Sequence, residues 1–401
     1  MTSSPDKTID WRFVLRVVLK AAALFVMVNL LFAVLNPLPA IGRISVYNGL
    51  VPGRQRLPYG EQPEAYNLSL DSLEAMFSTH EISRSKPTDE YRILIAGDSS
   101  VWGILLRPDE TLAAQINAAN LTLDGRPVRA YNIGHPILSV TKDLMLIDYA
   151  LRYEPDMIIW LVTLQSLPVD AQLTAPLVRN NAPTVLDLIT RYHLPLNASD
   201  PQLVMPDFWN QTLIGQRRAL ADWWRLQLYG FSWAQTGIDQ VYGDYTPRSN
   251  DFESDASWRG RTETDGLDRD DLLLDVFDAV RQYSIQQTGI QQTGVQQTGI
   301  PLWVINEPIY IADGENSDLR YNFWYPRWTY DRYRDLMQQA HKQASEQGGD
   351  ENHWNYLDLW DSIAPDEFTD SPVHLTPSGT RQLAQHIIAA LRGTDQSSGE
   401  G

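Results

Sequence analysis

Two segments far apart in the chain carry side chains suited to nucleophilic chemistry. In the first, GDSSVWG at positions 97–103, Ser99 follows a short apolar run and precedes a predicted helix. A serine in that place directs its hydroxyl above a sheet, and its backbone N–H belongs to the free donors of the helix start. This arrangement suits attack on a carbonyl carbon, because the N–H can stabilise the resulting oxyanion. A serine that only caps the helix gives the same sequence, so this segment alone leaves both interpretations open.

The second segment, DSPVHLTPSG at positions 370–379, favours the catalytic interpretation. It places His374 on a loop bounded by prolines, just before the last predicted helix. A serine hydroxyl is a poor nucleophile at neutral pH, and a histidine within hydrogen-bond reach can accept its proton. A carboxylate on the other ring nitrogen would fix the tautomer and stabilise the imidazolium. The alternative for His374 is a loop histidine that only hydrogen-bonds the backbone.

These residues need a scaffold, and the apolar periodicity of the chain predicts one. Short apolar runs alternate with amphipathic helical patterns, which is typical of a parallel sheet with right-handed crossovers. Active sites of such sheets lie at the carboxyl ends of the strands, where Ser99, Gly134 and 163–166 fall. The predicted strands are 92–96, 127–133, 156–162, 300–305 and 356–359, and the predicted helices are 67–79, 112–119, 141–153, 330–347 and 379–391.

The middle of the chain, about 170–283, gives a weaker pattern. It contains helical and aromatic fragments and a polar, acidic stretch at 249–271 that predicts a loop. A five-residue repeat based on IQQTG follows at 285–299. Its period matches neither a helix nor a strand, and its glycines interrupt both. We interpret it as a surface linker and assign it no function.

Taken in order, these blocks resemble the SGNH/GDSL hydrolase superfamily. The resemblance rests on GDSSVWG, the strand-end glycine of NIGH at 132–135, the polar residues after the strand DMIIWLV, and the loop around His374. It covers about 91–166 and 300–392 and implies a three-layer α/β/α sandwich with a mostly parallel sheet. Together with the apolar N-terminus, the chain resembles the membrane-anchored branch near the D-alanyl-lipoteichoic-acid transfer and alginate O-acetylation proteins.

The resemblance implies a role for each matching residue. Ser99 would be the nucleophile, His374 its base, and the N–H groups of Ser99 and Gly134 would form the oxyanion hole. Two positions depart from the family pattern. Gln165 takes the place of the family's oxyanion-binding asparagine, and its longer amide either substitutes or weakens activity. Asp370 lies one residue further from His374 than the family's acid, so only a bulged loop would bring its carboxylate to the ring.

The sequence leaves the choice of catalytic acid and the roles of several other residues undecided. Ser371 holds the usual place of the acid, and Asp366 or a Ser–His dyad are the alternatives to Asp370. We expect Trp102, His135 and Glu307 to contact substrate. The alternative for His135 is a structural loop histidine, and for Glu307 a capping or ion-paired carboxylate. The seven histidines show no metal-binding spacing and there is no EF-hand loop, so we expect no metal and no cofactor.

The composition of the chain excludes some classes of binding partner and some kinds of site. The 401 residues carry a formal charge of -18, with 50 acidic against 32 basic side chains. This average field repels nucleic acid, and no basic run offsets it, so we expect no nucleic-acid partner. The absence of cysteine excludes disulfides, thiol catalysis and thiolate metal sites.

The N-terminus predicts a membrane anchor. From Ala21 to Leu35 the only polar residue is Asn29, and the stretch 13–35 reaches the ~20 residues needed to cross a bilayer if Arg16 and Lys20 snorkel. The basic residues precede the apolar block, so we expect a single pass through the plasma membrane with the N-terminus in the cytoplasm and the domain outside. A cleaved signal peptide with the site AIG at 40–42 and a buried core helix are the alternatives.

The sequence therefore predicts an enzyme that acts on ester bonds. We expect an ester hydrolase or O-acyltransferase that works through an acyl-Ser99 intermediate on an acylated small molecule, lipid or envelope polysaccharide. The rival is a membrane-tethered protein of the same fold, weakly active or inactive, that binds an envelope glycan or a partner. The expected organisation is a cytoplasmic N-terminus 1–11, a transmembrane helix 12–36, a stem 37–85, a catalytic domain 86–392 with an insertion at about 170–299, and a disordered tail 393–401.

Overall fold

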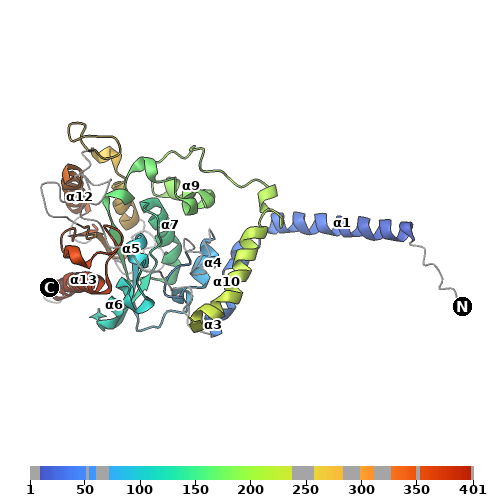
Figure 1. Cartoon of the computed structure of the whole chain (residues 1–401), viewed down its shortest axis with the longest axis horizontal. Helices are drawn as coiled ribbons and strands as arrows, with labels where there is room; N and C mark the ends of the chain where they lie inside the picture. The colour runs from blue at the N-terminus through green and yellow to red at the C-terminus, as the bar shows by residue number, and fades with distance from the viewer. Residues whose placement is uncertain are drawn as a thin grey trace, which may run out of the picture.

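A computed structural model describes most of the chain (Figure 1). The predicted repeat falls almost wholly outside the described residues, as do parts of the middle segment. Nothing structural is assigned to those positions. The described residues are 10–50, 54–59, 72–236, 257–282, 299–310, 327–348 and 353–398.

The centre of the molecule is a mixed α/β unit with a six-stranded, mostly parallel sheet. The strand order is β2-β3-β1-β4-β5-β6, and only β2 runs antiparallel to its neighbour. Each predicted strand is present within two residues of its expected ends. The strands are β1 Tyr91–Ala96, β2 Thr122–Leu123, β3 Arg126–Asn132, β4 Met157–Val162, β5 Leu302–Asn306 and β6 Asn355–Asp358.

Helices cover both faces of this sheet. Alternate strand residues point to opposite faces, so Leu94 and Trp160 belong to one hydrophobic cluster and Ile95 and Leu161 to another. The first cluster includes side chains of α7, Val140–Ala150, and α12, Arg327–Gly348. The second includes side chains of α6, Leu112–Ala118, and α13, Pro377–Ser398. Both faces of β1 and β4 are therefore buried, which is why their sequences are continuously apolar.

The strand register brings the expected site to one edge. In β1, Ile95 pairs with Asn132 of β3 and with Ile159 of β4, and Val162 pairs with Asn306 of β5. The carboxyl ends of these four strands therefore lie side by side.

The remaining described α-helices are α2 Leu38–Gly42, α3 Val46–Leu50, α4 Leu73–Ser78, α5 Ser99–Trp102, α8 Pro176–Asn180, α9 Ala182–Arg191, α10 Arg217–Thr236 and the helical residues 275–282.

The described parts of the segment expected to be a stem pack into the domain. Arg56 is buried, and its guanidinium donates hydrogen bonds to the carbonyl oxygens of Gly103 at 2.7 Å and Leu106 at 3.1 Å. The indole N–H of Trp102 donates to the carbonyl oxygen of Leu57 at 2.7 Å. Helix α4 joins the same hydrophobic cluster as α7. This part of the chain thus supports the turn that carries Ser99, rather than acting as a spacer.

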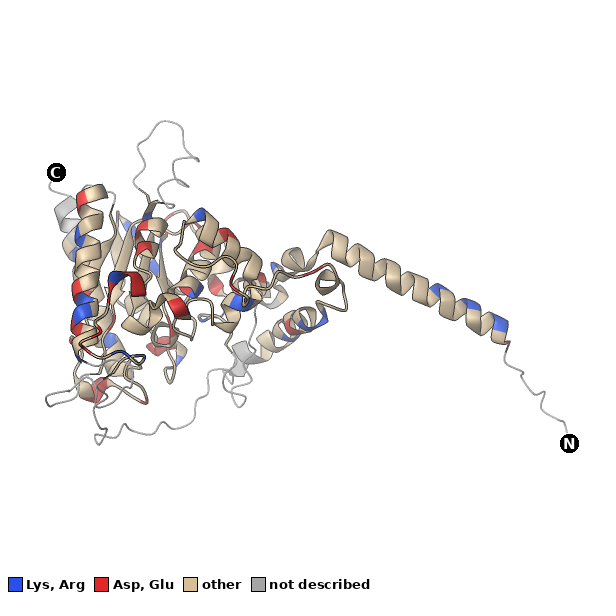
Figure 2. Ribbon diagram, turned by 90° about the horizontal axis from the view of Figure 1, so that it is seen from above, with Lys and Arg blue, Asp and Glu red and all other residues tan. Residues whose placement is uncertain are grey.

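Helix α1, Trp11–Leu35, projects from the domain (Figure 1). It is the one described helix that is long and apolar enough to cross a membrane. Only Asn29 and Ala33 are buried, which does not fit the core-helix alternative. In the ribbon of Figure 2, the basic residues of α1, in blue, lie towards its N-terminal end, with none further along the helix. At the other terminus, α13 continues to Ser398, beyond the expected domain end at 392.

Candidate active site

Ser99 is positioned by a tight turn between β1 and α5. Asp98 caps the helix, and its Oδ1 accepts a hydrogen bond from the N–H of Ser100 at 2.8 Å. Gly97 has a φ of +155°, and a Cβ there would lie 2.6 Å from Cγ2 of Val101 and 3.1 Å from the carbonyl oxygen of Leu161. Only glycine tolerates this backbone and this close approach. The GDS segment therefore fixes where the hydroxyl of Ser99 emerges.

Ser99 and His374 meet above the strand ends, although they are far apart in sequence. His374 Nε2 lies 2.8 Å from Ser99 Oγ, and His374 Nδ1 lies 2.8 Å from Oδ1 of Asp370. An ionised carboxylate can only accept, so Nδ1 carries the proton of the neutral ring. Nε2 is then free to accept the proton of the serine hydroxyl. This is the tautomer that base catalysis by His374 requires.

The loop 369–374 explains how Asp370 reaches the ring despite its unusual spacing. The loop is closed by a bridge between Phe368 and Leu375, and the N–H of Thr369 donates to the carbonyl oxygen of His374 at 2.8 Å. Ser371 turns its Oγ inward and accepts the N–H of His374 at 3.1 Å. The residue that occupies the family acid's position thus holds the turn, and the bulge that the sequence required is supplied by this closed loop.

The carboxyl group of Asp370 has a lowered pKa. Burial acts to raise the pKa, but the hydrogen bond from His374 and the charge that this ring carries when protonated outweigh it, with a further contribution from Thr369. The side chain of Asp370 is 39% exposed and that of His374 is 11% exposed. Asp370 therefore stays ionised at neutral pH while it remains in contact with solvent.

Gly134 lies against α5, as expected for a residue next to Ser99. A Cβ at this position would lie 2.7 Å from the backbone N of Trp102 and 2.6 Å from Val101 Cγ1. The N–H of Gly134 donates to Oδ1 of Asn132 at 3.0 Å. To bind an oxyanion, this N–H must share or exchange that acceptor.

Gln165 lies in a short 3-10 helix, Leu164–Ser166, immediately after β4. Its amide Nε2 is buried and has no hydrogen-bond partner among the described residues. Buried amide donors are nearly always paired in native proteins, so an unsatisfied one needs an explanation. An acceptor that arrives with the substrate would supply the missing partner.

The three residues expected to contact substrate are all buried. Trp102 is 1% exposed and packs its ring under the guanidinium of Arg56. His135 is also buried, with Nδ1 2.9 Å from the carbonyl oxygen of Pro136. Burial, and next the charge of Lys142, lower the pKa of His135 to about 3, so the ring is neutral. For His135, burial fits the structural alternative, and for both residues it does not fit direct contact with substrate.

Glu307 lies beneath the nucleophile turn. It is 2% exposed, and its carboxyl group accepts a short hydrogen bond from the hydroxyl of Ser100. Burial, and next the negative charge of Asp98, raise the pKa of Glu307 well above its ordinary value. Ser100 and Glu307 border a cavity of only about 10 Å³, which holds no more than about one water molecule. Glu307 thus supports α5, and its burial does not fit the expected contact with substrate.

A buried ion pair next to this turn is not evident from the sequence. Lys142 and Asp143 are in contact at 2.7 Å, with side chains 0% and 2% exposed. The ammonium group of Lys142 also donates to the carbonyl oxygens of Gly97, at 3.0 Å, and His135. Lys142 therefore ties the strand ends of β1 and β3 to α7. Its place inside an amphipathic helix pattern gave no signal of this role.

We predict that Lys142→Met destabilises the protein by about 3–5 kcal/mol, because it leaves Asp143 buried without its cation. Lys142→Met combined with Asp143→Asn should recover part of that loss, since the amide oxygen can still accept from Trp160 Nε1, now 3.1 Å from Asp143. The measurement is the thermal unfolding midpoint of the detergent-solubilised chain. A single variant as stable as the parent would show that the ion pair does not hold the turn.

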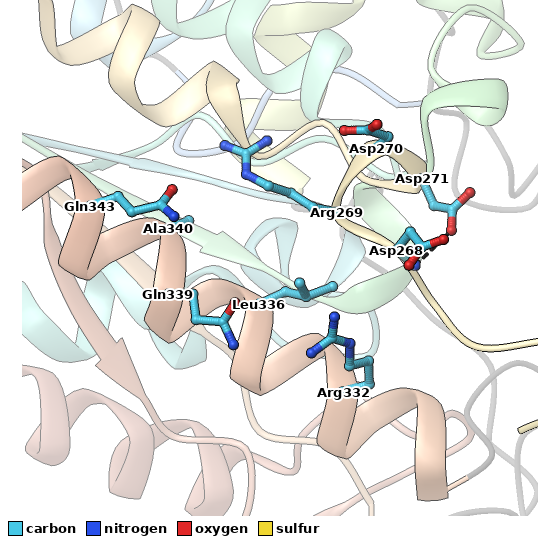
Figure 3. Close-up of a pocket in the computed structure, with 9 residues that line it drawn as sticks. All are labelled: Asp268, Arg269, Asp270, Asp271, Arg332, Leu336, Gln339, Ala340 and Gln343. Carbon is cyan, nitrogen blue, oxygen red and sulfur yellow. Dashed lines mark hydrogen bonds between the residues drawn. The ribbon is translucent and has the colours of Figure 1, made fainter.

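A separate polar cavity of about 420 Å³ lies between the 3-10 helix η9, Arg269–Asp271, and α12 (Figure 3). Ser99, His374 and Asp370 do not line it. The acidic and basic side chains around it largely neutralise one another: Asp271 pairs with Arg261, and Arg269 with Asp275. We assign this cavity no function.

Comparison with known proteins gives only remote structural likeness. A solved acetylxylan esterase from Geobacillus stearothermophilus, a catalytic mutant, is 12% identical over 75% of this chain and 94% of that chain, with a TM-score of 0.32. A carbohydrate acetylesterase family member from Sinorhizobium meliloti is 10% identical over 75% of this chain and 99% of that chain, with a TM-score of 0.31. No protein-family model and no curated protein sequence matches the chain. Likeness at these TM-scores does not place the chain in a family, so its function rests on the geometry of the site.

Proposed function

We propose that this protein is a serine-dependent acyl-ester hydrolase or O-acyltransferase with a three-layer α/β/α fold of the SGNH type. The observation that carries the proposal is the continuous hydrogen-bonded chain from Ser99 Oγ through His374 to Asp370, with 2.8 Å at each step. A structural histidine has no need for a serine on one ring nitrogen and a carboxylate on the other. The packing of helices on both faces of the sheet supports the fold assignment.

The proposed reaction has two balanced steps. In the first, Ser99 Oγ attacks the carbonyl carbon as its proton passes to His374 Nε2, and the carbonyl oxygen becomes an oxyanion. When this intermediate collapses, the bond to the alkoxy group breaks, and His374 returns its proton to the leaving alkoxide. In the second, His374 removes a proton from water or from an acceptor hydroxyl, and that oxygen attacks the acyl-Ser99 carbonyl. The bond from the acyl carbon to Ser99 Oγ then breaks, and His374 returns the proton to Ser99 Oγ.

The oxyanion is assigned to three donors. They are the N–H groups of Ser99 and Gly134 and the side-chain amide of Gln165. Nε2 of Gln165 has no hydrogen-bond partner among the described residues, which supports its place in this assignment. The N–H of Gly134 would exchange Asn132 Oδ1 for the oxyanion. The oxyanion is the stronger acceptor, because it carries a negative charge and the amide oxygen of Asn132 is neutral.

Gln165→Ala should slow ester cleavage by about a hundredfold or more, because the loss of one oxyanion donor costs roughly 3 kcal/mol of transition-state stabilisation. The value of KM should change little, since the donor acts on charge that develops only in the transition state. Steady-state kinetics with an acyl nitrophenyl ester give both constants. Gln165→Asn is the matched variant, and it should retain more activity than the alanine variant. A raised KM with unchanged kcat would instead assign Gln165 to ground-state binding.

The proposal is tested directly with a fluorophosphonate probe on the full chain in detergent. Phosphonylation replaces the leaving group at phosphorus with an activated serine oxygen, so an ordinary surface serine does not react. We expect labelling at one site, mapped by peptide mass spectrometry to the segment containing Ser99. Folded protein that takes up no label, or a label on another serine, would contradict the proposal.

The substrate class follows from the expected anchor. With α1 across the plasma membrane and the domain outside, an acylated lipid, small molecule or envelope polysaccharide is the substrate we propose. Hydrolysis and transfer differ in which hydroxyl attacks the acyl-serine. Adding a sugar or polyol acceptor to the assay would divert the acyl group to an ester product in a transferase and leave free acid as the product in a hydrolase.

One observation favours a second candidate, an inactive protein of this fold that binds an envelope glycan or a partner. The N–H of Gly134 already has an acceptor in Asn132, so one expected oxyanion donor is not free. The probe experiment separates the two candidates, because a binding protein has no need for an activated Ser99.

A further inference from the structure

Exposed large apolar side chains gather on one side of the molecule. Outside α1, all of those found among the described residues lie on 44–50, on the loop 204–214 or on α10. The described parts of 72–203 and 257–398 contribute none. Soluble surfaces carry such residues singly, whereas gathered ones mark an interaction site. We call this set the apolar platform: Ile44, Val46, Leu50, Val204, Met205, Phe208, Trp209, Ile214, Trp224, Leu228, Tyr229 and Phe231.

Direct hydrogen bonds join these segments to one another and to α1. The N–H of Ile214 donates to Oδ1 of Asn29, in α1, at 3.1 Å. Trp223 of α10 donates its indole N–H to the carbonyl oxygen of Ile44 at 3.1 Å, and the N–H of Val46 donates to Oε1 of Gln227 at 2.8 Å. In Figure 1, α10 runs across the side of the domain from which α1 leaves. The platform therefore lies on the side of the domain from which α1 leaves.

Helix α10 has the pattern of an interfacial helix. Trp223, Leu226 and Gly230 are buried against the domain at helical spacing. On the other side, Trp224 and Leu228 are 55% and 64% exposed, one helical turn apart. The same helix also carries exposed arginines, among them Arg218, Arg225 and the first helical residue, Arg217. Apolar rings and aliphatic chains flanked by arginine suit the boundary between acyl chains and phosphate headgroups.

The position of Asn29 fixes the depth of the platform relative to α1. Asn29 is buried by the loop, and it lies six residues before Leu35, about 9 Å along the helix. Even with Arg16 and Lys20 snorkelling, the residues 13–28 before it span only about 24 Å, against the ~30 Å of a hydrocarbon core. A helix that crosses the bilayer must therefore place Asn29 itself within the membrane. Ile214, which is bonded to Asn29, then lies at the same depth.

We propose that the apolar platform enters the lipid leaflet on the domain side and seats the domain directly on the membrane surface. This inference rests on the proposal that α1 spans the membrane. Asp207, exposed and accepting the N–H of Asn210 at 2.7 Å, keeps its part of the loop at the headgroup level. The domain is then held by two elements, α1 and α10, in one orientation to the bilayer.

Site-directed spin labelling tests this proposal. The sequence contains no cysteine, so a label attaches only at the cysteine that is introduced. Single variants Met205→Cys and Leu228→Cys of the full chain carry a nitroxide label in vesicles of phosphatidylcholine and phosphatidylglycerol. Val26→Cys, within α1, reports whether α1 is inserted. Lys342→Cys, on the exposed face of α12, is the aqueous control. Spin-label relaxation measures access to oxygen, which concentrates in lipid, and to a water-soluble nickel chelate.

We expect an oxygen-to-nickel access ratio several-fold higher at Met205 and Leu228 than at Lys342, and highest at Val26. Ratios at Met205 and Leu228 equal to that at Lys342, with Val26 in lipid, would overturn the platform and leave the anchor intact. A water-exposed Val26 would overturn both. Labels at Met205 and Leu228 shielded from both reagents would also overturn the proposal, because a second protein copy rather than lipid would then cover the surface. Unfolding midpoints equal to the parent's confirm that the variants fold.

Discussion

Ser99→Ala is expected to lower ester turnover by at least about 10³-fold, because no other group can form the acyl intermediate. The remaining rate would come from the oxyanion donors and from substrate binding alone. Binding of the ester should change little, since the substitution removes only one oxygen atom next to His374. Initial rates with an acyl nitrophenyl ester, together with loss of the fluorophosphonate label, measure the effect.

The adjacent serine provides the matched control. The hydroxyl of Ser100 donates to Glu307 rather than to His374, so Ser100→Ala should keep both the label and most of the turnover. Its unfolding midpoint should fall slightly, because Glu307 loses a buried donor. Equal loss of labelling in both variants would mean that neither serine is the specific nucleophile. Substantial turnover in Ser99→Ala would remove the covalent mechanism altogether.

Asp370→Asn is expected to give the second largest effect, a fall in kcat of about 10³-fold. An asparagine amide would donate to Nδ1 and favour the ring tautomer that carries its proton on Nε2, which cannot accept the proton of Ser99. A fully buried acid at this place is worth on the order of 10⁴ in rate. We expect less here because the Asp370 side chain is 39% exposed and solvent screens its charge.

Asp366→Asn is the control that separates the two acids considered from the sequence. Asp366 is exposed in the 3-10 helix Pro365–Glu367, while Asp370 contacts His374 Nδ1 at 2.8 Å. Turnover should therefore be unchanged in Asp366→Asn. Full activity in Asp370→Asn would instead support a Ser–His dyad.

The lowered pKa of Asp370 also fixes the sign of a pH effect. A carboxyl group whose pKa is lower in the folded state stabilises the fold above its unfolded pKa, and this stabilisation is lost as pH falls through the folded value. Between pH 5 and 8 the contribution of Asp370 is therefore constant. Any change in turnover across that range belongs to another group, and Asp370→Asn should lower stability by a constant amount across it, with the difference from the parent disappearing in acid.

Much of the scaffold was predictable from the chain because its determinants are local. The buried strands β1 and β4 are continuous apolar runs, and the turn after β1 has a φ of +155° at Gly97, a local conformation that favours glycine. Strand–helix alternation then places all parallel strand ends at one edge. The meeting of Ser99 and His374 follows from that topology.

The sequence by itself determined the strands and the apolar α1, and it singled out Ser99 and His374 as the proposed nucleophile and base. Only the tertiary structure decided that the loop 369–374 closes so that Asp370 reaches His374, and that Trp102, His135 and Glu307 are buried supports. Only the tertiary structure, likewise, shows that Arg56 of the expected stem bonds the domain and that the residues of the apolar platform lie together beside α1. The physical reason is range: a periodic pattern reports which neighbours along the chain share a face, whereas burial, loop closure and pairing depend on atoms contributed by distant segments.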